Sequence, residues 1–344
     1  MTSAEAAPAR PGRRILAGLV GGALAIALLL WALRGVHLAE VVRQIRNADP
    51  WPLALGVVLA SLTFPVRLIR WRLLLRSQTG EALPALPLWH AITIGFMANN
   101  LLPFRAGELV RVFAVTKLSG TRFTTAMSSI AVERVFDGLT CVALLVLGLV
   151  TSNLPSGVVV GGVSVARAAQ VAGVISFAAL VVAVAMVAFP AAAEGVIQRI
   201  FPPSRLSERL ISMIEGFRHG LSSLRSPALL VRVSVWSVVL WLLNALALYV
   251  SFASFDIPVG YGGALLLQGI LVIGISVQLT PGFVGQFEAA IVAALALYGI
   301  PNGVASSYAI AFHGATFLPI VLAGAWSLAR TPVALSDLRG TPGP

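Results

Sequence analysis

The chain has 344 residues, of which 58% are hydrophobic and only 11% are charged, whereas about 25% of the residues in a soluble domain are charged. Its mean hydropathy is +0.92 and its formal net charge is +11. This composition excludes a large soluble catalytic domain and indicates an all-α polytopic membrane protein.

The basic residues cluster in short loops between apolar runs. This is the pattern of the positive-inside rule, so we expect no nucleic-acid partner. The single cysteine, Cys141, lies in an apolar run and excludes a disulfide or a CxxC site within one chain. The charge therefore reports on membrane orientation.

The first part of the chain predicts a disordered basic N-terminus over residues 1–14 and a first membrane helix over 15–33. That apolar run is too long for a signal-peptide core and lacks a cleavage site. Residues 34–50 predict a short interfacial helix. The second span, 51–68, ends in a basic cluster, with Trp71 as its anchor at the membrane interface. The cluster consists of Arg67, Arg70, Arg72 and Arg76.

The stretch 88–118 predicts a re-entrant helical hairpin. Residues 88–102 are apolar but too short for a crossing, which needs about 20 residues. Asn99, Asn100 and Pro103 break this run, and Gly107 follows. Broken backbone at membrane depth is tolerated only where it is buried in protein or lines a cavity. We therefore expect this break to line an interior site.

Further spans are predicted over 125–150, 168–190, 229–255 and 304–328, with a loop at 151–167 and amphipathic interfacial helices at 191–228. Apolar helices at 261–279 and 283–299 flank a second broken stretch, 276–288. Its backbone-breaking residues are Pro281, Gly282 and Gly285, and its polar residues include Gln278, Gln286 and Glu288.

Loop charges set the expected topology. The loops after residues 67, 104 and 191 are basic, whereas 151–167 and 254–262 hold one arginine between them. This predicts a multi-pass protein of the inner or plasma membrane, with both termini in the cytoplasm, six crossings and two re-entrant hairpins. Counting the hairpins as paired crossings gives up to ten. The membrane domain extends over 15–330, and 331–344 is a polar tail.

The two broken stretches form a repeat, with halves at about 88–150 and 261–328. Pro103 and Gly107 correspond to Pro281 and Gly285. Arg134 lies 14 residues after the turn glycine at 120, and His313 lies 14 residues after the turn glycine at 299. In the expected topology the hairpins enter from opposite sides. Such an inverted repeat places a substrate site at the midplane between broken helices.

The residues at the first break suit an anion. Free helix N-termini favour negative charge, and the guanidinium forks of Arg105 and Arg111 match phosphate oxygens. Asn99 and Asn100 add neutral donors. A phosphate-bearing lipid headgroup is the candidate ligand. The alternative is that both arginines are ordinary interface residues.

Charged residues also interrupt the span 125–150. Glu133 and Asp137 share one helical face, with Arg134 beside them and Glu108 on the preceding segment. They predict a buried charge network along the headgroup path, or alternatively a salt bridge that holds the helices together. His313 is a lone histidine, for which a hydrogen-bonded core position competes with a proton relay.

Signatures of enzymes are missing. There is no GxSxG, no P-loop, no metal-ligand cluster and no acidic DxD pair. We therefore expect no cofactor, no metal and no catalytic residue, although whether the protein is an enzyme stays open.

Three motifs in order resemble the flippase-like membrane region of lysylphosphatidylglycerol synthases, which also occurs in stand-alone relatives. They are Asn99-Asn100-x-x-Pro103-x-x-x-Gly107-Glu108-x-x-Arg111, Glu133-Arg134-x-x-Asp137 and Pro281-Gly282-x-x-Gly285-x-x-Glu288. The resemblance implies a bacterial or archaeal inner-membrane protein that moves or presents a lipid, such as an aminoacylated phosphatidylglycerol, another anionic phospholipid, a polyprenyl-linked sugar or a hopanoid. The full-length synthases add a soluble transferase domain, so aminoacyl transfer is not expected of this chain.

Three hypotheses follow. The first is a lipid flippase or transporter that binds an anionic headgroup between the two hairpins. The second is an integral-membrane transferase acting on a lipid-linked donor, with Glu133 or Asp137 as general base. The third is a membrane scaffold that docks a separate cytosolic lipid-modifying enzyme through residues 191–228.

Overall fold

The computed structural model describes residues 37–77, 81–154 and 227–333, together with 26–27, 29–30, 159–160, 163–164, 167, 171, 174, 178 and 195. The predicted span 168–190, the predicted amphipathic helices of 191–228 and most of the predicted helix 15–33 lie outside the described residues. The protein is an all-α membrane protein. Its one described strand pair, β1 (Val159–Val160) with β2 (Val163–Ser164), lies in the region predicted as a loop.

The helices follow the apolar runs of the sequence closely. In chain order they are α2 (Leu38–Asn47), α3 (Pro50–Ser61), α4 (Thr63–Leu74), α5 (Ala85–Leu101), α6 (Ala106–Ser119), α7 (Phe123–Thr151), α11 (Pro227–Phe252), η1 (Ala253–Phe255), α12 (Tyr261–Gly274), η2 (Pro281–Phe283), α13 (Gln286–Ala296) and α14 (Asn302–Ala329). The short helix α2 carries its apolar residues on one face, as predicted for 34–50.

Three of the described helical segments are long and apolar enough to cross a membrane, namely Pro50–Leu74, Ala228–Phe255 and Asn302–Ala329. Helix α7 has 29 residues, which is about 43 Å at 1.5 Å per residue, but it carries three charged residues. α5, α6, α12 and α13 are shorter, with 11–17 residues. Short helices are what a broken-helix hairpin requires.

The second span is longer than expected, and its anchor was predicted wrongly. Helices α3 and α4 together extend to Leu74, and the ring of Trp71 is fully buried. Its indole Nε1–H donates to the hydroxyl of Ser129 on α7 at 3.0 Å. Arg70 is also fully buried. Because α4 packs against α5, α7 and α11, the last turns of the helix lie in the protein interior, not at an interface.

The two breaks share one backbone feature, two consecutive residues with positive φ directly after a proline. Break 1 (residues 102–105) joins α5 to α6, and break 2 (residues 275–285) joins α12 to α13. After Pro103, Phe104 and Arg105 have φ of 58° and 52°; after Pro281, Gly282 and Phe283 have φ of 61° and 60°. The turn glycines that follow, Gly120 and Gly299, also match, with φ of 68° and 71°. The repeat noted in the sequence is therefore a repeat of backbone geometry.

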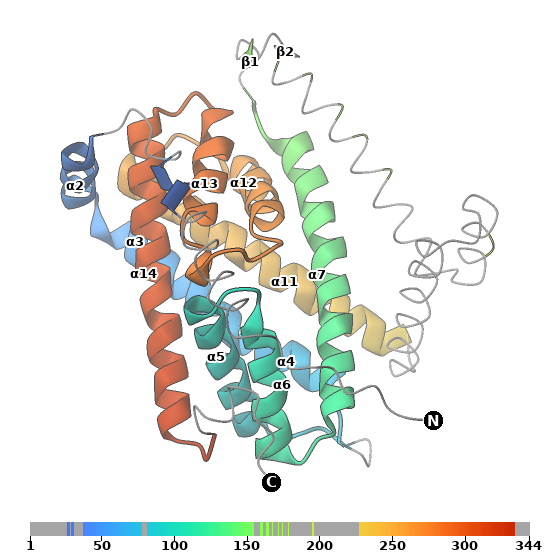
Figure 1. Cartoon of the computed structure of the whole chain (residues 1–344). Coiled ribbons are helices and arrows are strands. Elements are labelled where there is room, and N and C mark those ends of the chain that lie inside the picture. Colours follow the sequence, from blue (N-terminus) through green and yellow to red (C-terminus); the bar gives the residue numbers. More distant parts are fainter. Residues whose placement is uncertain are drawn as a thin grey trace, which may run out of the picture.

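The two hairpins extend in opposite directions from the point where the breaks meet (Figure 1). In this view α5 and α6 occupy the lower half and α12 and α13 the upper half. The long helix α14 packs against α5 and α13, and α7 packs against α6 and α12. Helix α11 crosses obliquely and contacts α3, α4, α7 and α12. Helices α7 and α14 thus pack against both hairpins.

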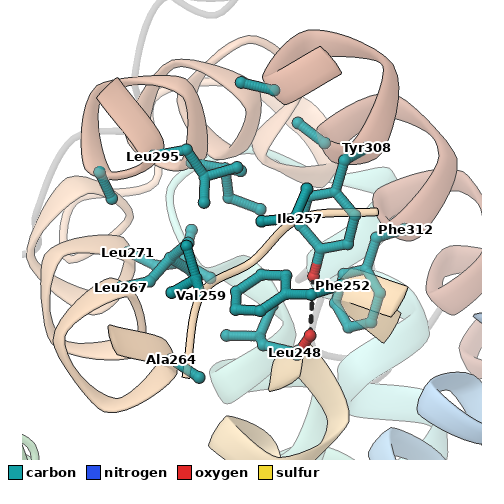
Figure 2. Close-up of a cluster of buried hydrophobic side chains, with 14 of the residues drawn as sticks. Leu248, Phe252, Ile257, Val259, Ala264, Leu267, Leu271, Leu295, Tyr308 and Phe312 are labelled. Carbon is teal, nitrogen blue, oxygen red and sulfur yellow. Dashed lines mark hydrogen bonds between the residues drawn. The ribbon is translucent and has the colours of Figure 1, made fainter. Parts of the chain in front are cut away.

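Each half has its own apolar core. In the second half, buried side chains of α11, α12, α13 and α14 surround Tyr308, whose hydroxyl lies 2.9 Å from that of Ser251 and 3.3 Å from the carbonyl oxygen of Leu248 (Figure 2). In the first half, Trp71 and Leu75 pack with buried residues of α5, α6 and α7. Two rigid cores therefore flank the region where the breaks meet.

Candidate functional site

The breaks are held together by the side chain of Gln278. Its Nε2 donates to the carbonyl oxygens of Asn99 at 2.6 Å and Leu102 at 2.8 Å, and its Oε1 accepts from the backbone N–H of Arg105 at 3.1 Å. The backbone N–H of Phe104 also donates to the carbonyl oxygen of Gln278 at 3.1 Å. One buried amide therefore satisfies backbone groups that the broken helix would leave unpaired.

Break 1 is closed by a second amide and by close packing. The Oδ1 of Asn99 accepts from the backbone N–H of Gly107 at 2.8 Å. A Cβ on Gly107 would lie 2.0 Å from the carbonyl oxygen of Gly95, so only glycine allows α5 and α6 to approach this closely. The Nδ2 of Asn100 is buried without a partner among the described residues. Asn99 therefore acts here as an acceptor, and the Nδ2 of Asn100 is a buried donor that a ligand could use.

Break 2 is held by Gln286 and Glu288. The Oε1 of Gln286 accepts from the backbone N–H groups of Leu279 and Thr280. One oxygen of Glu288 accepts from the backbone N–H of Gly285 at 2.7 Å, which caps α13. Its other oxygen lies 2.6 Å from Nδ1 of His313. The structure thus pairs two predicted site residues, Glu288 and His313, and gives Gln286 a backbone-holding position.

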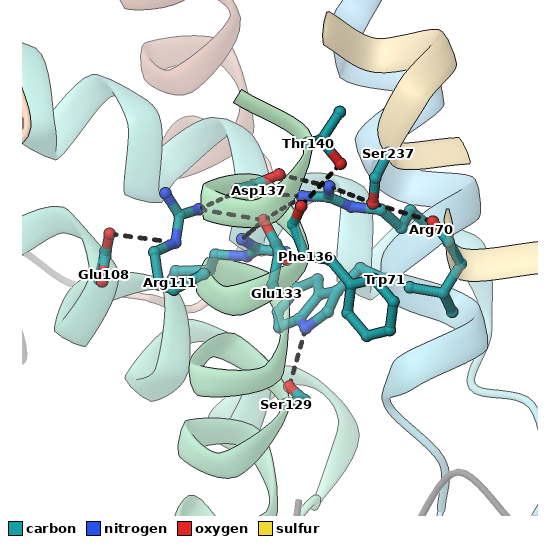
Figure 3. Close-up of polar contacts among 12 residues, drawn as sticks. Arg70, Trp71, Glu108, Arg111, Ser129, Glu133, Phe136, Asp137, Thr140 and Ser237 are labelled. Atoms are coloured by element: carbon teal, nitrogen blue, oxygen red, sulfur yellow. Dashed lines mark hydrogen bonds and ion pairs between the residues drawn. The ribbon is translucent and has the colours of Figure 1, made fainter. Parts of the chain in front are cut away.

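The charged residues of α7 meet arginines from α4 and α6 in the protein interior (Figure 3). Arg111 forms a two-point contact with Glu133, at 3.2 Å and 3.0 Å, and its guanidinium carbon lies 3.7 Å above the ring of Trp71. Arg111 and Glu133 are both almost fully buried. This is the geometry in which arginine binds a carboxylate most strongly.

Arg70 completes the buried part of this network. Its Nη1 donates to Asp137 at 2.5 Å and to the hydroxyl of Ser237 at 3.0 Å, while its Nη2 lies 3.0 Å from Glu133. Asp137 also accepts from the indole N–H of Trp241 at 3.0 Å. The predicted shared face of Glu133 and Asp137 is thus the face that Arg70 binds. The prediction that Arg70 belongs to a basic cluster at the end of the second span missed this position, because Arg70 lies on α4 and binds Asp137 and Glu133.

The outer part of the network is half-exposed. Arg134 lies 3.6 Å from Glu108, 3.2 Å from Glu133 and 3.4 Å from Asp137. Arg105 lies 3.4 Å from Glu108 and donates to the carbonyl oxygen of Ile275 at 3.2 Å. We call these residues the arginine–carboxylate network. Its members are Arg70, Arg105, Arg111, Arg134, Glu108, Glu133 and Asp137.

The network carries more positive than negative charge. Its four arginines face three carboxylates, which leaves one positive charge in excess. The buried part is balanced, with Arg70 and Arg111 against Glu133 and Asp137. The excess charge therefore lies in the half-exposed part, with Arg105 and Arg134 against Glu108, where a ligand can reach it. The excess favours an anion over a cation or a metal ion at this site.

Comparisons with known proteins agree with this architecture. Residues 18–324 match the family described as the lysylphosphatidylglycerol synthase TM region. The chain is 27% identical to the glycosyltransferase AglD of Haloferax volcanii over 94% of its own length, but it covers only 55% of that relative. It is 25% identical to a UPF0104 membrane protein of Methanothermobacter thermautotrophicus, covering 88% of this chain and 89% of the relative.

Proposed function

Because the chain belongs to the lysylphosphatidylglycerol synthase TM-region family, we propose that it is a lipid flippase or transporter that binds an anionic, phosphate-bearing headgroup between its two hairpins. The proposal includes hairpins that are re-entrant, a location in the cell membrane, and both termini in the cytoplasm. Candidate lipids are an anionic phospholipid or a polyprenyl-linked sugar phosphate.

The observation that carries this proposal is the excess positive charge beside two meeting breaks. Arg105 belongs to the network and also contacts break 2 through the carbonyl oxygen of Ile275. An anion that attracted its guanidinium would compete with this contact. Binding of a headgroup would therefore be coupled to the link between the hairpins, as a transport cycle requires.

Backbone strain at the breaks supports a moving part. Phe104, Arg105 and Phe283 are not glycines, yet all three have positive φ. Such a conformation costs about 1–3 kcal/mol per residue and persists only where the surroundings enforce it. Contacts from Gln278 and Gln286 supply that enforcement, so loss of a few hydrogen bonds would release the strain and let a break rearrange.

The test is lipid translocation in proteoliposomes. A fluorescent phosphatidylglycerol is placed in both leaflets, and dithionite then bleaches the label that reaches the outer leaflet. We expect Arg134→Ala to slow translocation by about tenfold or more, since a lost contact to a charged group costs about 1.5–3 kcal/mol. Arg76→Ala, in a loop where residue 76 pairs with Ala82, serves as control. Equal rates in the two variants would contradict the proposal.

The transferase hypothesis is favoured only by the name of the glycosyltransferase relative. Its candidate bases are both occupied, because Glu133 contacts three arginines and Asp137 contacts two. A carboxylate held in this way is a poor proton acceptor. Formation of a glycosylated product by the purified chain would revive that hypothesis.

The scaffold hypothesis concerns residues 191–228. If the chain docks a cytosolic lipid-modifying enzyme there, deletion of this segment would release a co-purifying enzyme and leave lipid binding unchanged. If the enzyme still co-purifies after the deletion, the scaffold hypothesis is contradicted.

A further inference from the structure

A cavity of about 210 Å³ lies between the two halves, next to break 2. Its walls come from α3 and α4, from α5 of the first hairpin, from α12 and α13 of the second, and from α11 and α14. Two of its lining residues, Ile275 and Phe287, flank break 2. The cavity therefore borders break 2, which Gln278 links to break 1.

Arg67 lines this cavity and differs from every member of the network. Its guanidinium carbon lies 4.6 Å from the ring centroid of Phe96, another lining residue. Within the described ranges it has neither a carboxylate partner nor a hydrogen-bond acceptor, whereas Arg70, one helical turn further along α4, contacts two carboxylates. Arg67 is thus a partly buried cation whose guanidinium contacts the ring of Phe96 and pairs with no carboxylate of the described chain.

The charges around Arg67 do not neutralise it. Asp137 and Glu133 act on it electrostatically, but so do Arg70 and Arg134. Those carboxylates are already engaged by Arg70, Arg111 and Arg134. With Arg67 added to the arginine–carboxylate network, five arginines stand against its three carboxylates. The excess is now two positive charges.

A second polar side chain in the cavity lacks a partner. Gln268 is 5% exposed and lines the cavity, and its carboxamide makes no hydrogen bond to another residue of the described chain. Asn244, also on the wall, uses its Nδ2 to donate to the carbonyl oxygen of Leu240 at 2.9 Å, which leaves its Oδ1 as an acceptor. The buried carboxamide of Gln268 and the partly exposed Oδ1 of Asn244 are therefore available to a polar ligand in the cavity.

We propose that this cavity binds the phosphate of the transported headgroup, with Arg67 as the anion-binding residue and Gln268 and Asn244 as partners for neutral polar groups on that headgroup. This inference rests on the proposed function. The shared chemistry is a phosphate oxyanion, which a planar guanidinium binds at two points.

The size and walls of the cavity restrict the ligand. At about 210 Å³ the cavity is smaller than the pockets of about 300–1,000 Å³ that hold whole drug-sized ligands. A phosphate with a small hydroxylated group fits this space, and acyl chains would have to extend out of it. The aromatic rings of Phe64, Phe96 and Phe312 on the wall suit the apolar face of such a group.

The test is isothermal titration calorimetry on the purified full chain in a neutral detergent. The probes are dihexanoyl phosphatidylglycerol, dihexanoylglycerol (the same chains without phosphate) and inorganic phosphate. We expect saturable binding of the phospholipid only. Arg67→Gln should weaken it by about tenfold or more, which is the usual loss for a contact to a charged group, and Gln268→Leu by a smaller factor. Arg72→Gln, an exposed arginine on the same helix, should bind as the unaltered protein does.

Thermal stability separates a binding role from a structural one. Because Arg67 has no ion-pair partner in the described structure, Arg67→Gln without ligand should melt at the same temperature as the unaltered protein or higher. Arg70→Gln should melt lower, because it leaves buried carboxylates unpaired. If Arg67→Gln melts as low as Arg70→Gln, Arg67 is structural and the inference fails.

The probes also distinguish this inference from the function on which it rests. Phospholipid binding that is the same in Arg67→Gln and the unaltered protein overturns the cavity site and leaves the lipid function standing. Phosphate binding that needs Arg67, without binding of the phospholipid, supports an oxyanion site and overturns the lipid function. If no probe binds, both are wrong.

Discussion

The amide nitrogen of Gln278 donates to the carbonyl oxygen of Asn99 at 2.6 Å, across a sequence separation of 179 residues. Further bonds from the same side chain reach Leu102 and Arg105. This single residue therefore satisfies the interrupted ends of α5 and α6 and joins the two halves of the repeat. A variant that lacks the Gln278 amide should therefore show how much the contact between the breaks contributes to stability.

Replacing Gln278 with leucine should lower the free energy of unfolding by about 3 kcal/mol or more, since three backbone groups of break 1 would lose their partner at about 1–3 kcal/mol each. Unfolding in mixed detergent micelles, followed by circular dichroism, measures this loss. Gln44→Leu is the control, because among the described residues the amide of Gln44 on α2 donates to Glu40 alone. If Gln44→Leu lowers the free energy of unfolding by the same amount, the contacts of Gln278 between the breaks do not account for the loss.

Arg70→Met should cost about 3–5 kcal/mol of unfolding free energy, the usual result of removing one partner from a buried ion pair. Arg70→Lys should recover only part of this, because an ammonium group cannot contact Asp137 and Glu133 with the same fork. The matched control is Arg122→Met at the exposed start of α7, which should stay within about 0.5 kcal/mol. Equal stability of the two methionine variants would contradict a balancing role for Arg70.

Gly107→Ala should destabilise the first hairpin by about 1–3 kcal/mol or more, since its Cβ would lie 2.0 Å from the carbonyl oxygen of Gly95. Gly138→Ala on α7 provides a glycine with no atom within 4 Å of the added Cβ. It should be neutral or stabilising by up to about 1 kcal/mol through helix propensity. Thermal melts of the two purified variants test the difference, and a melt of Gly107→Ala at or above that of Gly138→Ala would exclude close packing of α5 on α6.

Glu288 and His313 should be energetically coupled. A double-mutant cycle with Glu288→Ala and His313→Ala should give a coupling energy of about 1–3 kcal/mol, because the two groups are 2.6 Å apart and poorly exposed. The exposed pair Glu40–Arg43, at 4.0 Å, should give about 0.5 kcal/mol or less. Similar values for both pairs would make the histidine contact incidental, and the capping of α13 by Glu288 would then be its whole structural contribution.

Much of the site was predictable from local spacing. Residues four apart on a helix share a face, so Glu133 and Asp137 had to point the same way and needed cationic partners. Proline and glycine at residues 103, 107, 281 and 285 marked the breaks, because these residues cannot continue a helix or can adopt positive φ. Arg111 was among the candidates for another reason, as a guanidinium that suits a phosphate, and the structure pairs it with Glu133 instead.

The partners of longer range were not predictable. Arg67 and Arg70 belong to a cluster of arginines that is typical of the end of a membrane span. Trp71, within this cluster, is typical of an anchor at the membrane interface. In the fold, Arg70 pairs with a carboxylate, Trp71 lies beneath Arg111, and Arg67 faces a cavity. No local pattern distinguishes these three environments, because they depend on which helices pack around α4.

The sequence by itself determined that the protein is helical, that it lies in a membrane and that two of its helices are broken at matching positions. These properties follow from run length, composition and backbone chemistry, which act over a few residues. Only the tertiary structure decided which arginines are neutralised and which is left beside a cavity. That outcome depends on distances between residues far apart in the chain, which are set when α4, α7 and α11 pack together and exclude water from the charges between them.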